Sequence, residues 1–84
     1  MLTKDEQVKL AARLLGFSED KVSGNCGIIP NLNALYFSDP VRGGDSIIVA
    51  DDGSVLYANS SVEFNEHLRE FEKGRRTPLE SFDK

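Results

Sequence analysis

Cys26 and His67 are the two side chains in this sequence whose chemistry could support nucleophilic catalysis. A cysteine becomes a strong nucleophile when a neighbouring base withdraws its proton, and the chain contains a single cysteine and a single histidine. Cys26 lies in the turn-rich run 23–27, where a small, half-buried loop residue needs no catalytic role. Because a complete catalytic set is missing, we expect a protein that is not an enzyme, and a Cys26–His67 pair is the alternative.

Three aspartates, Asp45, Asp51 and Asp52, could offer carboxylates to a metal ion. Their spacing differs from the Asp-x-Asp-x-Asp-Gly pattern of a calcium-binding EF-hand loop. One histidine and one cysteine also give none of the usual zinc spacings. We therefore expect no metal and no cofactor, and we assign these aspartates to turns and strand ends.

The acidic residues are concentrated in the middle of the chain. Residues 43–72 carry seven acids and one base, a net charge of −6, whereas residues 1–42 are neutral and residues 73–84 carry +2. A nucleic-acid-binding surface needs the opposite sign, so we expect no nucleic-acid partner. The excess either keeps a small protein soluble or suits a basic protein partner. The candidate partner-binding residues are Asp45, Asp51, Asp52, Glu63, Glu66 and Glu70.

The acidic segment also contains the clearest structural pattern in the sequence. Residues 46–50 form a β-branched apolar run, and residues 55–58 form a second apolar run. Between them stand Asp52 and Gly53, and Asp-Gly between two apolar runs is a strong signal for a β-hairpin. We expect Ile47 and Val49 to lie on the same face of the sheet, because side chains alternate along a strand.

A helix is predicted to follow the hairpin. Ser60 and Glu63 have the spacing of a capping box, in which two side chains satisfy the free backbone N–H groups at a helix start. The expected core residues of this helix are Phe64, Leu68 and Phe71, which share one helical face. His67 is expected at the boundary of that face.

A second capping box stands at the beginning of the chain, formed by Thr3 and Glu6. It predicts a helix over residues 5–15, which good helix formers fill. Gly16 is placed to end this helix in the left-handed conformation. A short helical turn capped by Ser18 is expected next.

These elements define an α+β fold in a single domain over residues 1–84. We expect an N-terminal helix, a three-stranded antiparallel meander whose first strand is 34–37, and a C-terminal helix packed on the sheet. Both helices are expected on one face. Pro30 interrupts the run 28–32, which indicates a loop or an edge segment. Residues 77–84 are expected to form a flexible tail.

The sequence contains no secretory signal and no run of about 18 apolar residues that could span a membrane. Its single cysteine excludes an internal disulfide. The expected location is therefore the cytoplasm, without a membrane partner.

The segment 43–71 resembles the C-terminal half of the SUKH superfamily. The resemblance consists of a Gly-led strand, an Asp-Gly turn, a second strand and a closing helix that follows a small polar cap. The matching positions are Gly44, 47–49, Asp52, Gly53, 55–57, 59–61, Phe64 and Leu68. Many bacterial members are immunity proteins that bind and neutralise toxins, often nucleases, and others are adaptor-like. The resemblance implies a non-enzymatic protein whose partner is a basic toxin domain.

We therefore expect a small acidic binding protein of the immunity type. The alternative is a homodimeric structural or regulatory module, because a three-stranded sheet has exposed edges that a second copy can cover. An exposed acidic face favours the first hypothesis, and a large uncovered apolar patch on the sheet favours the second.

Overall fold

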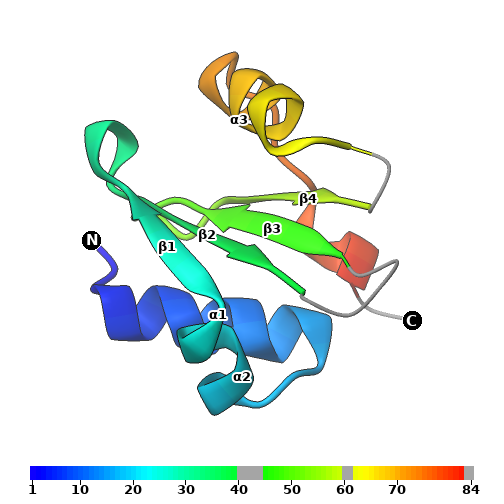
Figure 1. Ribbon diagram of the computed structural model, residues 1–84. Helices are drawn as coiled ribbons and strands as arrows, with labels where there is room; N and C mark the ends of the chain where they lie inside the picture. Colours follow the sequence, from blue (N-terminus) through cyan, green and yellow to red (C-terminus); the bar gives the residue numbers. More distant parts are fainter. Residues whose placement is uncertain (40–44, 60–61, 83–84) are drawn as a thin grey trace.

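The computed structural model describes residues 1–39, 45–59 and 62–82. An antiparallel sheet with the strand order β1-β2-β3-β4 lies between helices on its two faces (Figure 1). The elements, in chain order, are α1 (Lys4–Leu15), α2 (Glu19–Gly24), β1 (Cys26–Ile29), a 3₁₀ turn (Pro30–Leu32), β2 (Ala34–Ser38), β3 (Ser46–Val49), β4 (Val55–Ala58), α3 (Phe64–Glu72) and a second 3₁₀ turn (Leu79–Phe82).

The start of α1 has the predicted capping box. The Thr3 hydroxyl accepts a hydrogen bond from the backbone N–H of Glu6 at 3.3 Å, and the Glu6 carboxylate accepts one from the Thr3 N–H at 2.9 Å. The helix ends at Gly16, whose φ of 75° is left-handed, and the N–H of Phe17 folds back to the carbonyl of Ala12. The predicted helix is confirmed, one residue longer at its start.

The β3–β4 hairpin is confirmed as well. The Ala50 N–H donates to the Ser54 carbonyl at 2.8 Å, and Gly53 takes a φ of 90° in the turn. A glycine suits this position because a positive φ brings no Cβ clash. Ile47 and Val49 are fully buried in the same cluster, as the alternation of a strand requires.

The sheet has four strands where the sequence indicated three. Cys26–Ile29 pairs with β2 in an antiparallel register, with Cys26 opposite Phe37 and Ile29 opposite Ala34. Pro30 follows the strand and opens the 3₁₀ turn that leads into β2. Proline disrupts a strand interior but is compatible with the end of an edge strand, so Pro30 limits the length of β1 without preventing it.

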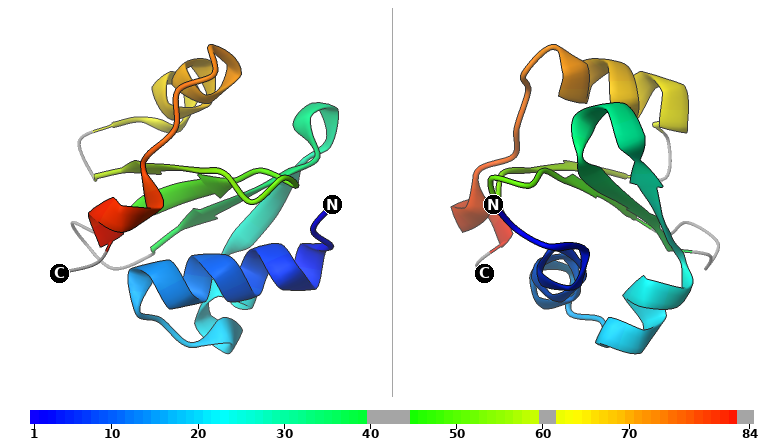
Figure 2. Two further views of the ribbon diagram at one scale, coloured as in Figure 1. Left: turned by 180° about the vertical axis from the view of Figure 1, so that it is seen from behind. Right: turned by 90° about the vertical axis from the view of Figure 1, so that its left-hand side faces the viewer.

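The helices lie on opposite faces of the sheet, so the expectation that both cover one face is wrong (Figure 2). Val8, Ala11 and Phe37 belong to a core beneath α1, whereas Ile48 and Phe71 belong to a second core beneath α3. All four residues of β3 are buried. A strand whose two faces are both apolar needs cover on both sides, and one helix on each face provides it.

The helix α3 begins at Phe64 and not at residue 60. Glu63 is its N-cap and makes no side-chain cap bond, and the predicted cap Ser60 lies outside the described residues. The buried side chains of α3 are those of His67 and Phe71. Phe64 is 42% exposed and Leu68 is only half-buried, so the predicted core face of this helix is displaced.

Residues 77–82, within the segment expected to be a flexible tail, pack along the sheet edge and α1. The Thr77 N–H donates to the Val55 carbonyl at 2.7 Å, and the Tyr57 N–H donates to the Thr77 hydroxyl at 2.9 Å. The 3₁₀ turn that follows contacts α1. The outer edge of β4 is therefore covered by the chain itself.

Candidate functional site

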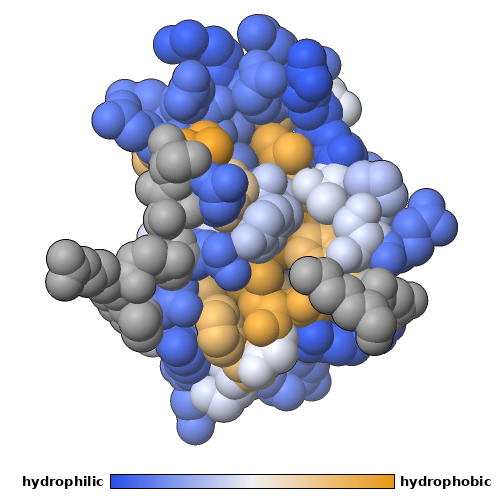
Figure 3. Space-filling model, turned by 90° about the vertical axis from the view of Figure 1, so that its right-hand side faces the viewer, coloured by the Kyte–Doolittle hydropathy of each residue, from blue (hydrophilic) through white to orange (hydrophobic). Residues whose placement is uncertain are grey.

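A cleft of about 280 Å³ opens between α3 and β4. Its walls are mainly apolar, and hydrophobic side chains are visible below the hydrophilic outer surface of α3 on this side of the molecule (Figure 3). The lining residues are Leu56, Tyr57, Ala58, Asn59, Val62, His67, Glu70 and Arg75. Its lining includes one buried titratable side chain, His67, and one ion pair, between Glu70 and Arg75.

His67 attaches α3 to the sheet at the base of this cleft. Its Nε2 atom lies 2.7 Å from the carbonyl oxygen of Leu56, and its Nδ1 atom lies 3.4 Å from the hydroxyl oxygen of Ser46. The residue is 1% exposed, so it is a core residue and not the boundary residue that the sequence indicated. Burial, opposed by the hydrogen bond to Leu56, lowers the pKa of His67 and favours the neutral ring.

Arg76 fixes the opposite end of α3. Its guanidinium carbon lies 3.8 Å from the centre of the Phe71 ring, and its Nη1 donates to the Phe71 carbonyl at 2.9 Å. Its Nε donates to the Ser54 hydroxyl at 2.8 Å, which connects the helix end to the hairpin turn. This basic residue therefore serves the internal structure of the protein.

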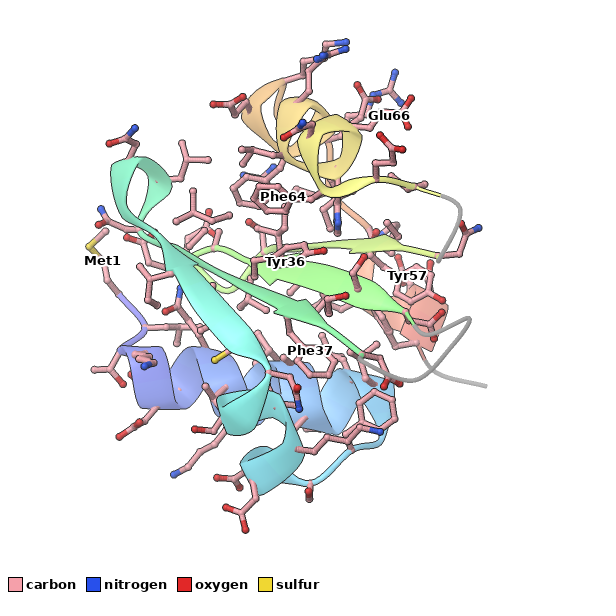
Figure 4. The ribbon with its side chains drawn as sticks, viewed as in Figure 1. Met1, Tyr36, Phe37, Tyr57, Phe64 and Glu66 are labelled. Atoms are coloured by element: carbon pink, nitrogen blue, oxygen red, sulfur yellow. The ribbon has the colours of Figure 1, made fainter. Side chains whose placement is uncertain are left out.

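Three of the predicted acids, Glu63, Glu66 and Glu70, lie along one flank of α3. Their spacing of three and four residues places them on the same side of a helix, and Glu70 lines the cleft beside β4. We call this row the acidic stripe. The side chain of Glu66 points away from the sheet, on the other side of the helix from Phe64 (Figure 4).

Within the acidic stripe, Glu70 is already paired. It forms ion pairs with Lys73 at 3.2 Å and with Arg75 at 2.8 Å, and the hydrogen bond from Lys73 holds the pKa of Glu70 below its ordinary value. Glu63 and Glu66 are exposed and take part in no ion pair with another described residue. They are the two carboxylates of the stripe that remain available to a partner.

Asp45 stands immediately before β3 and lines a second cavity together with Leu14 and Leu15 of α1. Its carboxylate accepts a hydrogen bond from the Tyr57 hydroxyl, and this bond, together with partial burial, raises the pKa of Tyr57 to about 12. Tyr57 lines the cleft and also a second cavity that Asp45 helps to form. Tyr57 stands opposite Ile47, a residue of the core beneath α1, so Asp45 lies on the α1 side of the sheet and apart from the acidic stripe on α3.

Asp51 and Asp52 lie at the other end of β3, in the hairpin turn. Asp52 accepts hydrogen bonds from the Ser54 hydroxyl at 2.6 Å and from the Ser54 N–H at 2.8 Å, which lower the pKa of Asp52. The Asp51 carbonyl accepts from the N–H of Leu2. The six predicted acids consequently divide into the three of the acidic stripe on α3, Asp45 on the α1 side of the sheet, and a pair in the hairpin turn.

The opposite flank of α3 exposes Phe64. Its ring meets the ring of Tyr36 edge-on, with the centroids 4.6 Å apart and an interplanar angle of 79°. The sequence pattern assigned Phe64 to the core because it continues the apolar period of the helix. No signal in the sequence shows that the Phe64 ring remains 42% exposed in the fold.

The sheet separates Cys26 from His67. The Cys26 side chain packs against the core beneath α1, and its Sγ lies 3.5 Å from the carbonyl oxygen of Ser23. His67 is buried beneath α3 on the other face. The structure thus places the two residues of the alternative catalytic pair on opposite faces of the sheet.

No family model, no curated protein and no solved structure matches this chain. No cluster of three or more potential metal-ligating side chains occurs within residues 1–39, 45–59 and 62–82. None of the helices in the described part of the chain combines the length and the apolarity needed to cross a bilayer.

Proposed function

We propose that this protein is a small, non-enzymatic binding domain that receives a basic partner protein on the acidic stripe of α3. The observation that carries the proposal is the position of Glu63 and Glu66, two exposed carboxylates that form no ion pair with another described residue and stand in one row with Glu70, which lines the apolar cleft. A lysine or arginine can lay its aliphatic stem along apolar walls while its charge meets a carboxylate. The stripe and the cleft together suit such a side chain.

The resemblance of residues 43–71 to the SUKH superfamily supports the same class of function. It makes the proposed partner a basic toxin or nuclease domain, and it makes this protein an immunity-type inhibitor that acts in the cytoplasm. The net charge of −6 over residues 43–72 agrees with a basic partner. The proposal needs no cofactor, and it includes neither a nucleic acid nor a membrane.

A homodimeric structural or regulatory module is the second proposal. The observation that favours it is the edge of β1, which has no strand beside it within the described residues. Both faces of the sheet are covered by helices, so an uncovered apolar sheet face does not support this alternative.

The binding proposal is tested with the basic proteins encoded beside this protein's gene. The measurement is the association rate with each of them, at low and at high salt, for the parent and for the Glu63→Lys/Glu66→Lys variant. Complementary charge accelerates the encounter and salt screens it. We expect the variant to associate at least about tenfold more slowly at low salt and to approach the parent at high salt.

The matched control is the Glu19→Lys/Asp20→Lys variant. It changes the net charge by the same amount as Glu63→Lys/Glu66→Lys. Glu19 and Asp20 lie in the first turn of α2, and Glu63 and Glu66 lie at the start of α3. We expect the control to keep most of the parental rate, since α2 lies on the other face of the sheet. If both variants slow association equally, the effect comes from net charge and not from the acidic stripe. Association rates that change neither with salt nor with Glu63→Lys/Glu66→Lys would contradict the proposal.

A further inference from the structure

We propose that two copies of this chain associate through β1, antiparallel to each other, so that their sheets become continuous. The two-fold axis passes beside Gly27, and the occupant of the β1 edge is β1 of the second copy. The interface is distinct from the acidic stripe, which lies on α3.

The two edges of the sheet differ in their protection. Along β4, Thr77 occupies the outer edge and satisfies the carbonyl of Val55 and the N–H of Tyr57. Along β1, no backbone hydrogen bond reaches the outer side from another described residue. An unpaired strand edge is a template for another strand, and among the described residues that template is available at the β1 edge and not along Val55–Tyr57 of β4.

The ladder with β2 determines which groups of β1 point outward. The Asn25 carbonyl accepts from the Ser38 N–H, and β1 continues from there in register with β2. The backbone N–H and C=O groups of successive residues point to alternate sides of a strand, so those of Gly27 and Ile29 point toward β2. The N–H and C=O groups of Cys26 and Ile28 therefore point away from the sheet.

This alternation makes the edge complementary to itself. When Gly27 stands opposite Gly27 of the second copy, Cys26 stands opposite Ile28 in both directions. Each Cys26–Ile28 pair then exchanges two backbone hydrogen bonds, because both residues present their polar groups outward. If the register shifted by one residue, the outward-pointing N–H and C=O groups of one strand would stand opposite residues whose polar groups point away from them. These hydrogen bonds would then be lost.

The side chains of β1 fit the same arrangement. The strand reads Cys-Gly-Ile-Ile and carries no charge, so no like charges meet across the axis. Ile28 is 47% exposed in the single chain and lies on the same face as Cys26, where the second copy's strand covers it. A Cβ at Gly27 would meet no atom within 4 Å, so the space beside the axis is open.

The covered edge of β4 limits the assembly to two copies. A head-to-tail contact of β1 with β4 of another copy would need the position that Thr77 occupies. The contact that remains is the symmetric one between β1 and β1 of the second copy. Because this contact uses the same edge of both copies, no edge is left for a third copy. Because β1 has four residues, we expect a weak, concentration-dependent dimer.

The first test measures the mass of the full-length chain by sedimentation velocity from micromolar concentrations to about 1 mM. We expect the parent to approach the mass of two chains and Ile28→Lys to remain a single chain. The matched control is Leu79→Lys, which charges another half-exposed apolar residue away from β1 and should dimerise as the parent does. Circular dichroism establishes that each variant is folded. A parent that stays monomeric over the whole range, or equal behaviour of the two variants, overturns the proposal.

The second test uses a disulfide to establish the register. In a Cys26→Ser background, Gly27→Cys places two thiols across the axis at a non-hydrogen-bonded pair, where Cα atoms are about 4.5 Å apart and a disulfide can form. Gly24→Cys in the same background is the control, since its Cβ also meets nothing within 4 Å. We expect mild oxidation to link the Gly27→Cys chains and not the Gly24→Cys chains. Equal linkage, or none in the first variant, overturns the arrangement; both tests use this chain alone and are independent of the basic partner.

Discussion

The Nε2 atom of His67 lies 2.7 Å from the carbonyl oxygen of Leu56, so α3 is hydrogen-bonded directly to β4. Because a carbonyl only accepts, Nε2 carries a proton. In the neutral ring Nδ1 is then an acceptor for the Ser46 hydroxyl. This contact holds the helix that carries Glu63 and Glu66, and the position of the acidic stripe depends on it.

The first prediction concerns the pH dependence of stability. Burial lowers the pKa of His67 in the folded chain, so between the ordinary value of about 6.5 and that lower value the unfolded chain binds a proton that the folded chain does not. The free energy of unfolding should therefore fall as the pH falls through this range, and should be level above it. Urea unfolding at a series of pH values between about 5.5 and 8 measures the slope.

His67→Gln is the control for this slope, because its amide can donate to Leu56 but does not titrate. His67 is the single histidine of the chain, and the pKa of Glu70 in the same cleft is lowered, away from this range. We expect a nearly flat profile for His67→Gln. A parent profile as flat as that of the variant would show that the ring is protonated in the fold as easily as in water.

The second prediction compares two apolar residues of α3. Phe71 is 4% exposed and lies in the core beneath the helix, whereas Leu68 is half-buried. Phe71→Ala should cost about 3–5 kcal/mol in the free energy of unfolding, and Leu68→Ala about 1–2 kcal/mol, because the cost grows with the cavity left behind. Thermal melting of both variants tests the order, and a larger loss for Leu68→Ala would contradict it.

The third prediction separates two neighbouring arginines. Arg76 lies over the Phe71 ring and donates to Ser54, whereas Arg75 forms an exposed ion pair with Glu70. Arg76→Ala should lower the free energy of unfolding by about 1 kcal/mol, a fall of roughly 4–8 °C in melting temperature for a domain of this size. Arg75→Ala should change it much less, since exposed ion pairs contribute little. Equal melting temperatures would show that the Arg76 contacts do not stabilise α3.

Local signals in the sequence identified the elements whose formation is local. The Thr3 and Glu6 pair, Gly16, and the turn at Gly53 each act within a few residues, and each is found in its expected place. The number of strands could not be obtained in the same way. Whether the residues before Pro30 form β1 depends on pairing with β2, and a proline at a strand end leaves both outcomes open.

The arrangement of the helices depends on long-range packing. The apolar run of β3 is compatible with one covered face or with two, and only the structure shows α1 and α3 on opposite faces. That arrangement also explains why His67 is buried. With α3 on this face of the sheet, the imidazole ring of His67 reaches the hydroxyl of Ser46. For the candidate site, spacing could place Glu63 and Glu66 on one flank of a helix. It could not show that Glu70 is paired with Arg75, or that the Asp52 carboxylate is hydrogen-bonded to Ser54.

The last prediction concerns the hydrogen bond between Tyr57 and Asp45. The Asp45 carboxylate accepts from the Tyr57 hydroxyl, and ionising that hydroxyl would place two negative charges side by side in a partly buried position. The pKa of Tyr57 is therefore raised to about 12, and Asp45→Asn should return it toward its ordinary value near 10 by removing the charge. Absorbance of the tyrosinate near 295 nm measures the titration, in a Tyr36→Phe background so that Tyr57 is the tyrosine observed. Circular dichroism at each pH establishes that the chain is still folded. A titration midpoint that is the same with Asp45 and with Asp45→Asn would show that the two side chains do not meet.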